Sequence, residues 1–77
     1  MNEKAYLKNI GKNIKRIRKE IGITQVELGY RCDFERPSVN RIEAGNTNPT
    51  ALTLKKIAEA LEVPVEDFFR IPNSEKK

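Results

Sequence analysis

Apolar residues recur every three or four positions across the first part of the chain. This is the spacing of one face of an α-helix, and it predicts a helix from about Lys4 to Ile21. Gly22 follows, and glycine commonly stands directly after the end of a helix. We expect the apolar stripe to face a core and a separate lysine face to be solvated surface that adds long-range attraction. The stripe comprises Leu7, Ile10, Ile14, Ile17 and Ile21, and the lysine face comprises Lys8, Lys12, Lys15 and Lys19.

The residues after this helix mark the start of a second, shorter one. Thr24, followed three residues later by Glu27, has the spacing of a capping box, and Ile23 stands where a hydrophobic staple residue would. We predict that this helix ends near Cys32 and Asp33, because aspartate tolerates a turn conformation.

A third helix is predicted from about Arg36 to Ala44. Pro37 is compatible with a first helical turn, where no backbone donor is needed, and this puts the start of the helix at Glu35 or Arg36. Gly45 ends the helix, and a turn over residues 46–49 follows.

Two further helices complete an all-α pattern without a convincing strand. Thr50 caps the fourth helix, and Pro64 opens a last short helix that carries Phe68 and Phe69. The fold class we expect is all-α, a compact five-helix bundle over residues 1–70, followed by a flexible C-terminal tail over 71–77. The expected buried face of the fourth helix is Leu54, Ile57, Ala58 and Leu61.

Composition excludes several kinds of chemistry. The 77 residues suffice for one domain with a modest core. Cys32 is the single cysteine and there is no histidine, so an internal disulfide, a zinc site of the usual nitrogen and sulfur ligands, and histidine-based catalysis are all excluded. We therefore expect Cys32 to be a small core residue, and we expect no metal, no cofactor and no enzymatic activity.

The charge balance weakly favours nucleic acid as a partner. Fifteen basic and eleven acidic residues give a net charge of +4, and residues 1–22 alone hold seven basic and two acidic residues. No apolar run is long enough to span a bilayer, and residues 1–4 lack the apolar core of a secretory signal. We expect a cytoplasmic protein.

The third helix combines a small apolar underside with a polar tip. Val39 and Ile42 lie on one side and are its only residues suited to a core. Two short helices joined by a tight turn over residues 32–35, the second with a polar tip, form a helix-turn-helix, and arginine, serine and asparagine can bind base edges in the major groove. The polar tip comprises Arg36, Pro37, Ser38, Asn40 and Arg41.

The chain resembles the phage repressor and Cro family of helix-turn-helix regulators over roughly residues 7–69. Four segments carry the resemblance, namely 22–28 (GITQVEL), 42–45 (IEAG), 48–50 (NPT) and 54–61 (LKKIAEAL). It implies a lambda repressor-like DNA-binding domain and a partly buried ion pair between Arg18 and Glu43. It further implies DNA contacts by Gln25, Arg36, Pro37, Ser38, Arg41, Asn46, Thr47 and Asn48. We add Asn40, because it lies on the polar side of the third helix, and Glu35, because it lies beside the phosphates.

Several residues depart from the family pattern. Asp33 stands where glycine usually ends the second helix, and Gly29 stands where a small alanine is usual, which softens the helix. Glu35 brings a negative charge near the phosphates, where it could cap the helix, pair with Arg36 or accept from a cytosine amine. The loop after the third helix has asparagine where related proteins often have lysine, which lowers the expected affinity and salt dependence.

These observations predict a sequence-specific DNA-binding transcriptional regulator. One recognition helix contacts few base pairs, so we expect a homodimer that reads a palindromic operator with half-sites about 34 Å apart. Phe68 and Phe69 are the candidate dimer residues, one of which should instead complete the core. The end of the domain resembles restriction–modification controller proteins.

Two other functions remain open. The chain could be an antitoxin or another protein-interaction module that binds a partner such as a toxin, with DNA binding secondary. RNA binding is the less favoured alternative, because the few aromatic residues available for stacking are mostly expected in the core.

Overall fold

The computed structural model describes residues 2–34 and 38–71, and in this part of the chain all regular structure is helical. Four α-helices are followed by one 3₁₀ helix, where a fifth helix was expected; the expected all-α fold is confirmed. None of the described helices combines the length and the apolar character needed to cross a membrane. The elements are α1 (Glu3–Ile21), α2 (Gln25–Cys32), α3 (Ser38–Ala44), α4 (Ala51–Leu61) and η1 (Val65–Phe69).

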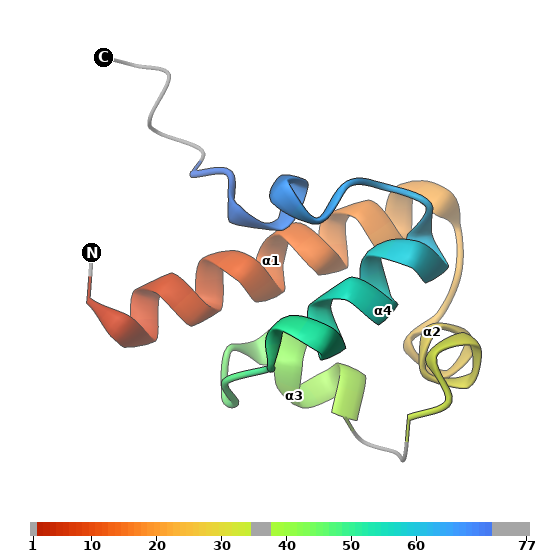
Figure 1. The fold of residues 1–77 in the computed structure, drawn as a ribbon, viewed down its shortest axis with the longest axis horizontal. Coiled ribbons are helices and arrows are strands. Elements are labelled where there is room, and N and C mark those ends of the chain that lie inside the picture. Colours follow the sequence, from red (N-terminus) through yellow and green to blue (C-terminus); the bar gives the residue numbers. More distant parts are fainter. Residues whose placement is uncertain (1, 35–37, 72–77) are drawn as a thin grey trace.

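The long helix α1 supports the rest of the molecule. In Figure 1 it runs across the whole fold, with α3 and α2 below it, α4 in front, and η1 returning above it. Asn2 caps its start, because the Asn2 side-chain oxygen accepts from the backbone N–H of Ala5 at 2.8 Å. Its end is the predicted one, since Gly22 adopts the left-handed conformation at φ 93°.

Helix α2 begins and ends as predicted, with one difference at its start. Thr24 Oγ1 accepts from the backbone N–H of Glu27 at 3.0 Å, which is half of the expected capping box. The Glu27 carboxylate does not return to Thr24 and instead pairs with Arg31 at 2.9 Å, one turn further along. Asp33 ends the helix in the left-handed conformation, at φ 60°.

The core lies between α1, α2, α3 and α4 and is closed by η1. The predicted apolar stripe of α1 enters it through its central residues, whereas Leu7 is half-buried and Ile21 stays 45% exposed at the end of the helix. Cys32 is a core residue as expected, and burial raises the pKa of its thiol although nearby Lys56 acts in the opposite direction. The largest fully buried side chains are Phe68, Ile14, Leu28, Ile57 and Leu61.

Two buried asparagines of α1 hold the C-terminal part of the fold in place. Asn13 Nδ2 donates to the backbone oxygens of Phe68 at 2.9 Å and Arg70 at 2.8 Å, and Asn9 Nδ2 donates to the same Arg70 oxygen at 2.9 Å. Phe68 is thereby the member of the aromatic pair that completes the core. Because its side chain is fully buried within one chain, only Phe69 of the two candidate dimer residues has surface left for a partner.

Candidate nucleic-acid interface

Helix α3 is held by its underside and presents polar side chains on its other sides. Val39 and Ile42 are each 5% exposed and pack into the core, which confirms the predicted anchors. Asn40 and Arg41 are exposed, and Ser38 is half-buried at the first described turn. The described part of this short helix therefore offers amide, guanidinium and hydroxyl groups to a partner.

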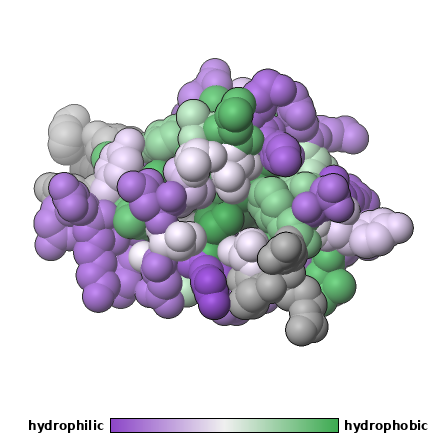
Figure 2. Space-filling model, turned by 60° about the horizontal axis from the view of Figure 1, so that its bottom comes forward, coloured by the Kyte–Doolittle hydropathy of each residue, from purple (hydrophilic) through white to green (hydrophobic). Residues whose placement is uncertain are grey.

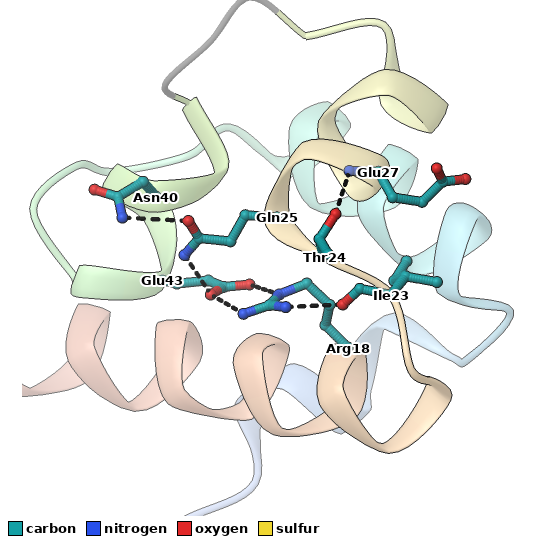
Figure 3. Close-up of polar contacts among 7 residues, drawn as sticks. All are labelled: Arg18, Ile23, Thr24, Gln25, Glu27, Asn40 and Glu43. Carbon is teal, nitrogen blue, oxygen red and sulfur yellow. Dashed lines mark hydrogen bonds and ion pairs between the residues drawn. The ribbon is translucent and has the colours of Figure 1, made fainter.

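A buried ion pair fixes α3 against α1. Arg18 and Glu43 meet in a two-pronged contact, with Nε to Oε2 at 2.7 Å and Nη2 to Oε1 at 3.0 Å. The two side chains are only 7% and 2% exposed. Arg18 Nη1 also donates to the backbone oxygen of Ile23 at 2.8 Å, so the turn between α1 and α2 is tied into the same group (Figure 3). Such a fork matches the planar geometry of both groups.

Gln25 joins this buried pair to the exposed face of α3. Its Nε2 donates to Glu43 Oε1 at 3.0 Å, and its Oε1 accepts from Asn40 Nδ2 at 3.3 Å. Figure 3 shows Gln25 lying between the two, with the carbonyl oxygen of Asn40 pointing away from the contact. The first residue of α2 and the outward amide of α3 are therefore held in one fixed arrangement.

The backbone of α1 touches the end of α3 directly at Gly11. A Cβ placed on Gly11 would lie 2.4 Å from the backbone oxygens of both Ile42 and Glu43. At Gly45, which has φ 77°, a Cβ would lie 2.8 Å from the Cα of Lys8. The sequence analysis did not single out Gly11. A glycine inside a strongly helical pattern was the available signal, because such a residue usually has a packing reason.

A hollow beside α3 gathers four of the predicted contact residues: Ser38 and Arg41 from the helix, and Thr47 and Asn48 from the loop after it. Thr50 and Thr53 at the start of α4 line the same hollow, with their hydroxyl oxygens 3.0 Å apart. Neither threonine was predicted to contact DNA. Thr50 was interpreted only as a helix cap, and Thr53 was not singled out.

The side of the molecule that carries α3 has a hydrophilic rim and a less polar middle. In Figure 2, hydrophilic residues dominate the rim of this side, and residues of intermediate and apolar character lie toward its centre. The described residues contain no group of three or more side chains suited to hold a metal ion. The chemistry offered here is hydrogen bonding and positive charge.

Comparisons with known proteins identify the family. A helix-turn-helix family model matches residues 14–68. The chain belongs to the helix-turn-helix family. An uncharacterized HTH-type transcriptional regulator of Sinorhizobium fredii is 41% identical over 56 residues, which cover 73% of each protein. The immunity repressor protein of Bacillus phage phi105 is 39% identical over 56 residues, covering 73% of this chain and 39% of the repressor.

A solved structure shows the same fold. The crystal structure of the restriction-modification controller protein C.AhdI from Aeromonas hydrophila superposes with a TM-score of 0.82 at 26% identity. The match covers 84% of this chain and 98% of that protein. In this helix-turn-helix protein, α2 and α3 are the two helices of the motif, and Gln25 and Glu43 link them.

The structure describes only some of the remaining predicted contact residues. Asn46 is exposed next to Thr47 and Asn48, in the loop that follows α3. Glu35, Arg36 and Pro37, together with the predicted start of the third helix, lie outside the described residues. Ser38, Asn40 and Arg41 stand on α3, and Gln25 of α2 joins them through its hydrogen bond with Asn40.

Proposed function

We propose that this chain is a sequence-specific DNA-binding transcriptional regulator that inserts the outward side of α3 into the major groove. The observation that carries the proposal is that Asn40 and Arg41 are exposed on a helix anchored by Val39 and Ile42, with the Asn40 amide held by Gln25. Arginine can bind guanine with two hydrogen bonds, and asparagine can do the same with adenine. An anchored helix that exposes these two side chains suits the reading of base edges.

Contacts to the phosphate backbone would set the position of α3 in the groove. Asn46, Thr47 and Asn48 follow α3 directly, and Gln25 stands at the start of α2 beside it. Their amide and hydroxyl groups are neutral hydrogen-bonding partners, so they orient the protein on the duplex while releasing few counterions. Arg36, Pro37 and Ser38 would contribute to the same surface, as the family resemblance implies, and Glu35 would do so from its place beside the phosphates.

We further propose that the protein acts as a homodimer on a palindromic operator. Phe69 is half-buried, with its ring centre 6.3 Å from that of Tyr6, and both residues line a hollow that also includes Pro49 and Asn48. This hollow adjoins the loop after α3. In the proposed dimer a second copy is seated here, and its recognition helix reads the second half-site, about 34 Å from the first.

The role proposed for this chain is binding and not catalysis, in the cytoplasm or nucleoid where its DNA target lies. Selection of bound duplexes from a random pool tests the proposal. We expect enrichment of one sequence that consists of two inverted half-sites about one helical turn apart. An unenriched pool, with equal binding to every duplex, would show that α3 does not read bases.

A further inference from the structure

The lysine face of α1 is a row of four exposed basic side chains on one helix. Lys8, Lys12, Lys15 and Lys19 are all exposed, and in residues 2–34 and 38–71 none of them forms an ion pair. Most other exposed basic side chains of the same ranges are neutralised by a carboxylate, in the pairs Arg16–Glu20, Arg31–Glu27, Lys55–Glu59 and Arg70–Asp67.

This face starts where α3 ends. The Cα of Lys8 lies directly against Gly45, and Gly11 packs on the last carbonyl groups of α3. The other three lysines continue on the same face for about 16 Å at the rise of an α-helix. Figure 3 shows α1 running along the edge of the pair formed by α2 and α3. The lysine face therefore extends from the edge of the proposed DNA-binding surface.

A row of like charges three or four residues apart on a helix is mutually repulsive. A partner with regularly spaced negative charges removes this cost, and duplex DNA carries a phosphate every few ångströms along each strand. We propose that Lys8, Lys12, Lys15 and Lys19 form a second DNA contact that binds phosphates next to the half-site read by α3. This inference rests on the proposed function and adds a sequence-independent contact to it.

The test compares two double variants of equal charge. Lys12→Gln/Lys15→Gln removes two charges from this face away from the contact of Lys8 with Gly45, and Lys55→Gln/Lys56→Gln removes two charges from exposed positions of α4. The affinity of each for a selected duplex with long flanks is measured against salt concentration. We expect the first variant to reduce the slope of log K against log salt by about 1.8, because each phosphate contact contributes about 0.9.

The control variant should leave the slope close to that of the wild type. On a duplex cut to the two half-sites, the slopes of the two variants should converge, since the flanking phosphates are then absent. Equal slopes for both variants on the long duplex would overturn the inference and leave only a general effect of net charge. Wild-type protein that binds no selected duplex would instead refute the proposed function, which distinguishes the two failures.

Discussion

At the scale of single residues, the fold should be sensitive to the loss of either member of the buried pair Arg18–Glu43. Removing one member of a buried ion pair leaves the other charge buried without compensation, which typically costs about 3–5 kcal/mol. We predict that Glu43→Ala lowers the free energy of unfolding by this amount, because Arg18 cannot reach solvent from its buried position. Urea denaturation followed by circular dichroism measures the change.

The exposed pair Lys55–Glu59 provides the matched control for this prediction. Both side chains are more than 60% exposed, so Glu59→Ala should cost less than about 1 kcal/mol. If Glu43→Ala and Glu59→Ala changed the unfolding free energy equally, the pair between Arg18 and Glu43 would not stabilise α3 as described.

Cys32 gives the stability a defined dependence on alkaline pH. Burial raises the pKa of its thiol above the ordinary value of 9.0, so the folded protein keeps the thiol proton at a pH where the unfolded chain loses it. The contribution of the buried, protonated thiol to the free energy of unfolding is therefore fully present below the pKa of the unfolded chain. It is lost as the pH rises through the pKa of the folded protein. Wild type should lose more stability than Cys32→Ala between about pH 8 and about pH 10. Parallel pH profiles would contradict this prediction.

At the scale of the elements, the contact between α1 and α3 depends on Gly11. We predict that Gly11→Ala destabilises the protein by about 1–3 kcal/mol, because its methyl group would overlap the backbone oxygens of Ile42 and Glu43. Gly29→Ala is the matched control in α2. Its methyl group would lie 3.6 Å from Val39, an ordinary contact, so this change should stabilise the helix by about 0.5–1 kcal/mol. Thermal unfolding of both variants tests the opposite signs.

The elements also show which features the sequence predicts well. Helix ends at Gly22, Thr24 and Asp33 were predicted because caps depend on residues next to each other in the chain. The hydrogen bond from Asn13 to Phe68 spans 55 residues, and no local pattern could predict it. For the same reason the sequence could not decide which of Phe68 and Phe69 would be buried.

In the candidate site, too, local features were predicted from the sequence, and contacts between distant residues were predicted only where the family resemblance implied them. The anchors Val39 and Ile42 were predicted from helical periodicity, and the pair between Arg18 and Glu43 from the family resemblance. The bridging position of Gln25 and the hollow that adds Thr53 arise only when α2, α3 and the start of α4 come together in space. Tertiary contacts of this kind leave no periodic signal in the sequence.

At the scale of the whole molecule, the proposed function requires two copies to associate, because one recognition helix contacts few base pairs. We predict that Phe69→Ser weakens self-association at least about tenfold, a loss of roughly 1.4 kcal/mol, because it removes an aromatic side chain from the proposed interface. Tyr30→Ser, at an aromatic residue that is 83% exposed on α2, is the control and should have no effect. Sedimentation equilibrium measures both, with circular dichroism to verify folding. A wild-type protein that stays monomeric at all concentrations would refute the proposed dimer.

The proposed function depends on the outward side of α3 reading base edges in duplex DNA. The most direct measurement is the affinity of Arg41→Ala for the selected duplex and for a scrambled duplex, beside Arg16→Ala, which removes a charge from α1. We predict that Arg41→Ala loses about 1–3 kcal/mol on the selected duplex and much less on the scrambled one, whereas Arg16→Ala affects both equally and weakly. An equal loss on both duplexes for Arg41→Ala, or no loss on either, would contradict the proposed function.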